Sequence, residues 1–228
     1  MRTIYRQPGM RLACAICAGA LLLGAGCANM AQIGRKPKPV ATVRRNFVGD
    51  KQLPMGLLRV VLMPVAGGDA APPESAAALD SVFATELVRQ KRFEVVTISR
   101  EECRRRFGDD SLLSSSALPA GFLEEIARDF GAQGVLFVDI TSYHPIRPIT
   151  IGVRAKLALT AGGRLCWSFD DVFSAGDPTV LAELKKYYAA AGGDRGEVPA
   201  NLPEAALISP SRYGAYCAYA TFGTLPAR

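Results

Sequence analysis

An uncharged apolar run behind a basic start sets the first 26 residues of this 228-residue chain apart from the rest. The basic start carries Arg2, Arg6 and Arg11, and the run covers residues 12–26 and ends in glycine and alanine. This is the layout of a secretory signal peptide, whose small residues let a peptidase hold the extended backbone closely. The run of about 15 residues is shorter than the roughly 20 that span a bilayer as a helix. We therefore predict that residues 1–26 are removed, which leaves about 200 residues, the size of one domain.

Cys27 directly follows the small residues that end this run. The arrangement resembles the signal of bacterial lipoproteins, the lipobox, although Gly24 stands where that family most often has leucine. The resemblance implies that the thiol of Cys27 takes a diacylglyceryl group, that cleavage follows in front of it, and that the new N-terminus is acylated. It also implies sorting to the outer membrane, facing the periplasm, because Ala28 stands where inner-membrane lipoproteins often carry aspartate. The alternatives are a transmembrane helix and an ordinary cleaved signal with a chance cysteine.

Residues 27–55 are predicted to be a lipidated N-terminus and a flexible tether, and residues 56–228 a single periplasmic domain. The tether is polar and basic, and Pro37 and Pro39 interrupt it, so it has little apolar surface to bury. The formal net charge of +6 falls to +3 once the three signal arginines leave. A net charge this small, without a dense basic patch, does not indicate nucleic-acid binding. Arginines at 100 and 104–106 are interspersed with acidic residues, so we expect a solvated helix face there.

Hydrophobic periodicity predicts an alternation of strands and helices across the domain. Buried strands are expected at residues 57–65, 93–98 and 135–140, and helices at 72–88, 99–107 and 119–130. Apolar and polar residues then alternate in 151–159 and 165–169 around a turn with two glycines, which predicts a β-hairpin. A helix at 178–190, a loop at 191–208 and a helix at 210–222 follow. The fold class is therefore α/β, a mixed sheet with strand-helix alternation, followed by a β-hairpin and C-terminal helices.

Four segments occur in a characteristic order: RVVLMPVAG, LDSVFATELVRQKRFEVV, FLEEIARDFGAQGVLFVDITSY and VRAKLALTAGGRLCWSFD. This order resembles the envelope lipoproteins of the curli-secretion (CsgG) type, to which LpoB and the N-terminal domain of TolB are similar in fold. The matching residues are 61–64, 92–96 and 130–136, with Gly163 and Trp167 on the return strand. The resemblance covers residues 57–173 and implies fold more than function, because its motifs are structural.

No residue pattern predicts a catalytic, metal or cofactor site. His144 is the only histidine, and it has no metal-ligating partner at helix spacing. Residues 67–69, Gly-Gly-Asp, follow a strand as a phosphate loop would, but they match neither G-x-G-x-x-G nor the P-loop with its lysine. The acidic pairs at 124–125 and 170–171 are adjacent and diverge on a helix or strand, so neither is a matched acid–base couple. We expect a loop or surface histidine and a plain strand–helix turn.

Cys103, Cys166 and Cys217 remain beside Cys27 once the signal has left. We expect these three to be buried thiols. The alternative is a disulfide between Cys166 and Cys217, because both residues lie in apolar settings and the periplasm is oxidising.

Aromatic residues recur at regular spacing in two places. Trp167, Phe169 and Phe173 are expected to pack in the core, with a binding platform as the alternative. The tyrosines recur at helical spacing in the last predicted helix, at Tyr213, Tyr216 and Tyr219. A packed terminal helix is expected there, with a partner surface as the alternative.

These observations predict a non-enzymatic, lipid-anchored periplasmic module that binds another component of the cell envelope. Its partners would be the membrane, through the lipid, and an envelope protein or further copies of itself. The alternative is an oligomeric secretion-channel component similar to the curli export lipoprotein, although the sequence shows no second pair of long lipid-facing hairpins. An envelope hydrolase is a third and poorer hypothesis, because it needs a nucleophile clustered with a base.

Overall fold

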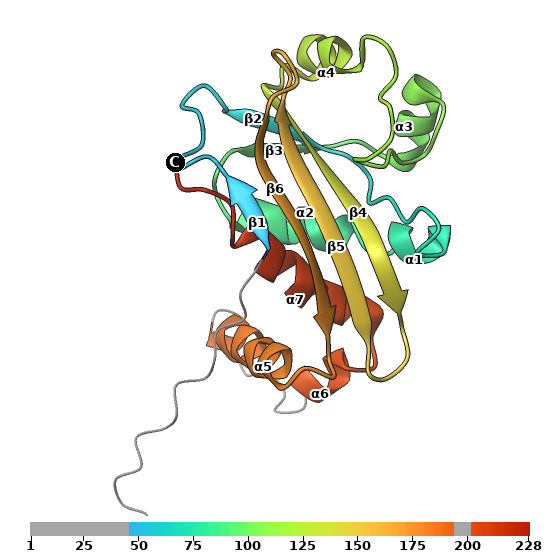
Figure 1. Cartoon of the computed structure of the whole chain (residues 1–228), viewed down its shortest axis with the longest axis vertical. Helices are drawn as coiled ribbons and strands as arrows, with labels where there is room; N and C mark the ends of the chain where they lie inside the picture. Colours follow the sequence, from blue (N-terminus) through green and yellow to red (C-terminus); the bar gives the residue numbers. More distant parts are fainter. Residues whose placement is uncertain (1–45, 194–201) are drawn as a thin grey trace, which may run out of the picture. The chain divides into compact units, whose positions relative to one another are not determined.

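The computed structural model describes residues 46–193 and 202–228, which form a six-stranded sheet and seven helices within those ranges (Figure 1). The signal peptide, Cys27 and the tether as far as residue 45 lie outside the described residues. The strands are β1 Phe47–Gly49, β2 Arg59–Leu62, β3 Glu94–Thr97, β4 Gly134–His144, β5 Thr150–Leu159 and β6 Leu165–Ser174. The helices are α1 Pro73–Ala77, α2 Asp80–Arg89, α3 Arg100–Phe107, α4 Phe122–Phe130, α5 Pro178–Gly193, α6 Leu202–Ala206 and α7 Pro210–Phe222.

The sheet is mixed, and its strand order is β1-β6-β5-β4-β2-β3. β2 pairs in parallel with both β3 and β4, and the strands from β4 through β5 and β6 to β1 are antiparallel. Parallel pairing requires crossover connections, which α2 and the α3–α4 segment supply. The β5–β6 hairpin turns through Gly162 and Gly163, whose φ angles of 76° and 68° favour glycine. The predicted α/β class, with its mixed sheet, hairpin and C-terminal helices, is confirmed.

Each face of the sheet packs against its own set of helices. Phe83 of α2 and Phe222 of α7 join the larger core on one face, where their rings meet edge to face at 5.8 Å. Phe122 of α4 and Cys103 of α3 join the smaller core on the other face. Burying one large apolar side chain stabilises the fold by about 1.5–3 kcal/mol, so the alternation along the central strands accounts for this layering.

The folded domain begins earlier than the predicted boundary at residue 56. β1 pairs antiparallel with β6, Gln52 forms a bridge with Ala227, and Leu53 is buried in the larger core. The predicted tether is therefore wrong for residues 46–55. The side chains of β1 are exposed and give no apolar pattern, and its partner strand is distant in sequence.

Three element boundaries also differ from the sequence prediction. The helix expected at 72–88 is two helices, α1 and α2, because the chain leaves regular helix at Ala78 and Leu79. The loop expected at 191–208 contains the short helix α6. β4 and β6 run further than expected, to His144 and Ser174, because they pair along the full length of β5.

Candidate functional site

A groove of about 410 Å³ lies between α2, α5 and α7, the helices that cover the larger core. Its lining combines aromatic, hydroxyl and charged side chains, which are Ser81, Val82, Thr85, Glu86, Arg89, Tyr187, Tyr188, Ser211, Arg212 and Ala215. A concave site with a few converging polar groups is the default candidate for binding. We call it the Glu86 groove.

Glu86 is the buried charge of this groove, with only 2% of the residue exposed. Its Oε1 accepts a hydrogen bond of 2.8 Å from the hydroxyl of Tyr187 and a second from the guanidinium of Arg89. Its Oε2 is buried and has no hydrogen-bond partner among the described residues. Burial raises the pKa of Glu86 above its usual value, while Tyr187 and Arg89 act in the opposite direction. The groove thus holds an acceptor atom that the domain itself does not satisfy.

Tyrosines form one wall of the Glu86 groove and continue beyond it. The ring of Tyr187 lies 4.9 Å from that of Tyr188 and 4.9 Å from that of Tyr219. The hydroxyl of Tyr188 donates to the carbonyl of Arg212 at 2.8 Å, which ties α5 to α7. Burial raises the pKa of Tyr188 to about 12 and that of Tyr187 well above its usual range, so both hydroxyls stay protonated donors.

The partner surface considered for the three tyrosines of α7 is wrong for two of them. Tyr213 and Tyr216 are buried in the larger core, because that face of α7 packs toward the sheet and α2. Tyr219 is 47% exposed and lies beside Tyr187. An exposed tyrosine pair is therefore present, but it is shared between α5 and α7.

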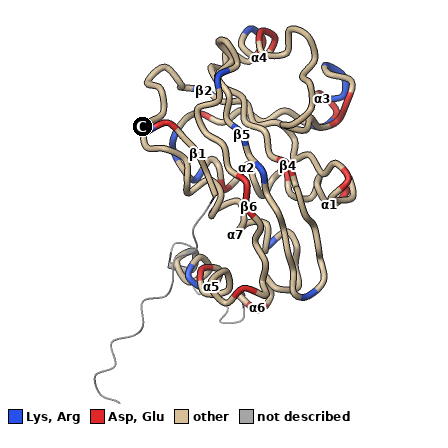
Figure 2. The backbone as a smooth tube through the Cα atoms, in the orientation of Figure 1, with Lys and Arg blue, Asp and Glu red and all other residues tan. Residues whose placement is uncertain are grey.

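A second polar cluster lies on the opposite face of the sheet, where β5 and β6 are not covered by a helix (Figure 1). Figure 2 shows basic positions on β5 next to acidic positions on β6. Nε of Arg154 donates to Asp170 at 2.7 Å, and Nζ of Lys156 donates to the carbonyl of Ser114 at 2.9 Å. A hollow of about 270 Å³ separates these charges from β1, where Val48 is 73% exposed. The charges of this cluster are already paired within the domain, which distinguishes it from the Glu86 groove.

Asp139 of β4 accepts hydrogen bonds from the loop between α3 and α4, next to this cluster. Its carboxylate is 1% exposed and accepts from the amide of Ser114 at 2.9 Å and from its hydroxyl at 2.6 Å. Burial raises the pKa of Asp139, and the bonds from Ser114 and the charges of Arg154 and Lys156 act against that increase. Each carboxylate oxygen therefore has a partner, and the residue serves to hold the loop.

No known protein-family model matches the chain, and no curated protein matches it. Several solved structures are similar to it at low sequence identity. The PelC dodecamer from Paraburkholderia phytofirmans is 14% identical with a TM-score of 0.48, over 81% of this chain and 99% of that one. Lipoprotein GNA1162 from Neisseria meningitidis is 16% identical with a TM-score of 0.41, over 60% of this chain and 97% of that one. The LpoB C-terminal domain from Salmonella enterica is 17% identical with a TM-score of 0.34, over 51% of this chain and 82% of that one.

The structure does not bring the other residues considered for chemistry together into a site. His144 ends β4 in an exposed position, and residues 67–69 form a plain turn. Glu125 pairs with Arg106 at 3.0 Å whereas Glu124 is exposed, so this acidic pair diverges as expected. Within the described ranges, no three His, Cys, Asp or Glu residues are arranged to hold a metal ion. No helix in those ranges has the length and apolarity to cross a bilayer.

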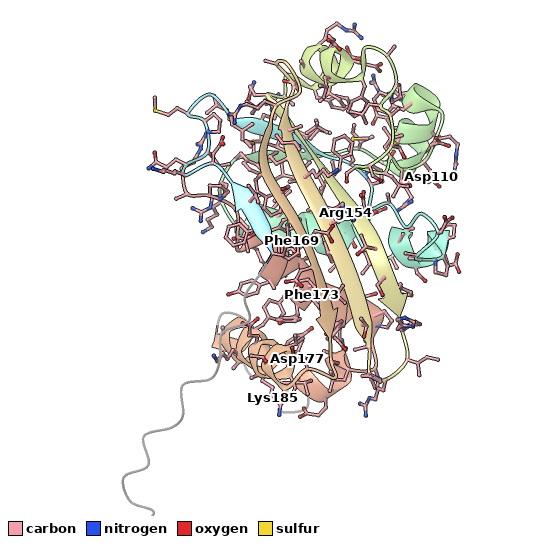
Figure 3. All side chains as sticks on the ribbon, in the orientation of Figure 1. Asp110, Arg154, Phe169, Phe173, Asp177 and Lys185 are labelled. Atoms are coloured by element: carbon pink, nitrogen blue, oxygen red, sulfur yellow. The ribbon has the colours of Figure 1, made fainter. Side chains whose placement is uncertain are left out.

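The acidic pair on β6 also diverges. Asp170 pairs with Arg154, whereas Asp171 accepts from the amide of Val172 at 2.8 Å. The aromatic side chains of β6 are buried, and the rings of Phe169 and Phe173 stack at 6.1 Å on the face toward the C-terminal helices (Figure 3). Core packing is confirmed for these residues, and the binding platform is not formed.

Two arginines of the cluster at 100 and 104–106 depart from the expected solvated face: Arg100, and Arg106, whose side chain is 24% exposed and pairs with Glu102, Glu125 and Asp129. Arg100 donates to Asp80 at 2.7 Å and to the carbonyl of Val65 at 2.6 Å, and only 19% of its side chain is exposed. It joins the start of α3 to α2 and to the segment that follows β2. Arg104 and Arg105 are exposed as expected.

The three cysteines of the domain are buried. Cys103 and Cys166 are free thiols, and Sγ of Cys166 lies 3.5 Å from the carbonyl of Leu157. The disulfide considered between Cys166 and Cys217 is therefore not formed. Burial raises the pKa of Cys103 to about 11 and also raises that of Cys166. These thiols are packing residues with little nucleophilic character.

Glu86 was not among the predicted site residues, although its position in the apolar stripe of α2 sets it apart. Phe83 and Leu87 belong to the apolar stripe of this helix, and Glu86 lies three residues after Phe83 on the same side. A charged residue inside an apolar helix stripe indicates either a buried pair or a site. Its partner Tyr187 comes from a helix 101 positions away and could not be assigned from the sequence, whereas its other partner, Arg89, follows three residues later in α2.

Proposed function

We propose that this chain is a non-enzymatic, lipid-anchored module of the bacterial cell envelope that binds a protein partner through the Glu86 groove. The observation that carries the proposal is the buried Oε2 of Glu86, which lacks a partner within the described residues, in a residue that lines the groove. A buried acceptor left unsatisfied costs about 1–3 kcal/mol. A partner that supplies a donor there recovers this free energy on binding.

The composition of the groove favours a protein as this partner. Tyrosine and arginine dominate the binding energy of protein interfaces, and Tyr187, Tyr219, Arg89 and Arg212 lie in or beside the groove. Arg212 is exposed, and no carboxylate of the described residues pairs with its guanidinium. The matching partner is a peptide segment with a hydrogen-bond donor for Glu86 and an acidic side chain for Arg212.

The anchor in this proposal is Cys27, modified by lipid and held in the outer membrane facing the periplasm. Each buried CH₂ of an acyl chain contributes about 0.8 kcal/mol, so a triply acylated cysteine stays in the bilayer. The segment between Cys27 and the first described residue carries Arg35, Lys36, Lys38 and two further arginines, and no acidic residue. Such a segment allows the domain to reach a partner while attracting anionic headgroups.

The anchor is tested by mass spectrometry of the mature N-terminus. The proposal requires a chain that begins at Cys27 and carries acyl groups. An unmodified Cys27, or retention of residues 1–26, would contradict it.

The partner site is tested by photocrosslinking in intact cells, with a crosslinking amino acid placed at Tyr219. The matched control places the same amino acid at Val172, which is 51% exposed on β6. We expect one discrete envelope protein to be captured from position 219, and the capture to be lost when Arg212→Glu is added. Equal capture from both positions would contradict the site. Crosslinks only between copies of this chain would favour the oligomeric alternative instead.

A further inference from the structure

A further hollow, of about 630 Å³, lies where the parallel strands β2 and β3 end. Its lining includes Asp80, Ser81, Thr85, Thr97, Arg100 and Glu102. We call it the strand-end hollow. Its volume is within the range of about 300–1,000 Å³ that is typical of binding sites.

The path of the chain explains why this hollow forms at one end of the sheet. β2 leads through α1 to α2, whose Phe83 packs in the larger core, and β3 leads to α3, whose Cys103 packs in the smaller core. Two adjacent parallel strands therefore lead to helices on opposite faces of the sheet, and a crevice opens outside their carboxyl ends. In open α/β sheets this crevice is the usual position of a ligand site.

The strand-end hollow adjoins the Glu86 groove along one face of α2. Ser81 and Thr85 line both of them, and these two exposed residues are one helical turn apart. Because both side chains are short, another backbone can pass close to α2 at this point. A helix is about 10 Å across with its side chains, which corresponds to about three residues of extended chain.

The linings of the two hollows carry opposite formal charges. Two arginines and one glutamate line the Glu86 groove, which gives +1, whereas Asp80, Glu102 and Arg100 line the strand-end hollow, which gives −1. Asp80 and Arg100 are joined to each other at 2.7 Å. Glu102 accepts through Oε1 from Arg106 at 3.0 Å, and its side chain stays 29% exposed. Glu102 is therefore the carboxylate that a basic group of a ligand can approach.

We propose that a segment of the partner protein crosses α2 in extended form and occupies both hollows, with an acidic side chain at Arg212 and a basic side chain at Glu102. About three residues separate the two side chains in the segment. This inference rests on the proposed function and deepens it, because it names the kind of segment that the partner supplies. An extended segment needs hydrogen-bond partners for its backbone, and the hydroxyls of Ser81 and Thr97 can each donate to a carbonyl and accept from an amide.

Photocrosslinking from a second position tests whether one segment occupies both hollows. The crosslinking amino acid is placed at Thr97, which is exposed at the end of β3, and in a separate variant at Tyr219, in the complete protein in intact cells. The control position is Arg105, which is exposed on α3 outside the hollow. Mass spectrometry of the crosslinked peptides then locates each attachment site in the captured protein.

We expect positions 97 and 219 to capture the same envelope protein, and position 105 to capture none. The two attachment sites should lie within about ten residues of each other, because about three residues cross α2 and both crosslinking side chains add reach. A basic residue is expected beside the site reached from position 97, and an acidic residue beside the site reached from position 219.

Charge reversal on α3 tests the role of Glu102 separately. Glu102→Lys is expected to lower capture from position 219 about tenfold, because it places like charges together. Glu101→Lys removes the same charge from the same helical turn outside the hollow, and is expected to leave capture unchanged. Because Glu102 also pairs with Arg106, urea denaturation checks that the variant is folded, and the milder Glu102→Gln should still lower capture several-fold.

The possible results separate this inference from the proposed function. Capture from position 219 without capture from position 97, or attachment to distant segments of the partner, would overturn the inference and leave the proposed function in place. Absence of capture from position 219 would overturn both. Attachment from position 97 only to this chain itself, or equal effects of Glu102→Lys and Glu101→Lys, would overturn the inference as well.

Discussion

The hydroxyl of Tyr187 donates a hydrogen bond of 2.8 Å to Oε1 of Glu86, and the two residues are 101 positions apart in the sequence. This bond joins α5 to α2 at the base of the groove. It also supplies one of the two donors that reach the buried carboxylate, the other being Arg89. The fold therefore depends on this contact in the place where we propose that a partner binds.

Replacement of Tyr187 by phenylalanine is expected to lower the free energy of unfolding by about 1–3 kcal/mol, because a buried carboxylate loses a donor. Urea denaturation of the wild type and the variant measures this difference. Tyr219→Phe is the control, because it changes an exposed tyrosine of the same cluster and is expected to have a small effect. Equal losses in the two variants would show that the bond to Glu86 has no special role.

Glu86→Gln is expected to change how stability depends on pH. Burial raises the folded-state pKa of Glu86 above 4.5, so its contribution to stability is present below that value and is lost as pH rises through the folded-state pKa. Glutamine does not titrate. The wild type should therefore lose stability relative to Glu86→Gln as pH rises from about 4 to 8.

Urea denaturation across that pH range measures the difference between the two proteins. Glu204→Gln, on the exposed side of α6, serves as the control and should follow the wild type. A difference between wild type and Glu86→Gln that does not change with pH would contradict the raised pKa.

Gly214 lets α7 approach Leu79 closely. A Cβ at this position would lie 2.6 Å from Cδ2 of Leu79, which is itself 1% exposed. Alanine favours a helix over glycine by about 1 kcal/mol, but overpacking costs about 1–3 kcal/mol, so we expect Gly214→Ala to destabilise the domain. Gly56→Ala, where nothing lies within 4 Å of the added Cβ, should leave the thermal midpoint nearly unchanged. A higher midpoint for Gly214→Ala would contradict this packing.

Ser114→Ala is expected to loosen the loop between α3 and α4. The variant removes the 2.6 Å hydroxyl bond to the buried Asp139 and leaves the bond from the backbone amide. We expect limited proteolysis within residues 109–118 to become several-fold faster, with little change in global stability. Ser115→Ala, at an exposed neighbour, is the control. Unchanged cleavage in Ser114→Ala would show that the backbone bond alone fixes the loop.

Much of the fold could be predicted from local patterns. Val153 and Ala155 alternate with Arg154 and Lys156, and the structure buries the first pair in the larger core and leaves the second on the opposite face. Period-two alternation of this kind is set by burial on one face of a strand, so the sequence carries it directly.

The start of the domain and the candidate site could not be predicted in the same way. β1 has exposed side chains, and only its distant partner β6 makes it a strand. The groove depends on the approach of three helices, and only Glu86 left a local signal. Tertiary neighbours far apart in the sequence decide both features.

Burial makes Cys103 and Cys166 slow to react. The thiolate is the reacting species, and a pKa of about 11 leaves almost none of Cys103 in that form at pH 8. We expect iodoacetamide to modify neither residue in the native mature protein, and to modify both in urea without any reductant, as read by peptide mapping. If Cys166 reacted in urea only after reduction, it would be held in a disulfide, and the packing of β6 against the C-terminal helices would have a covalent element. Reaction in urea without reductant means that apolar burial alone holds this region together, because Cys166 then contributes only as a buried side chain of the larger core.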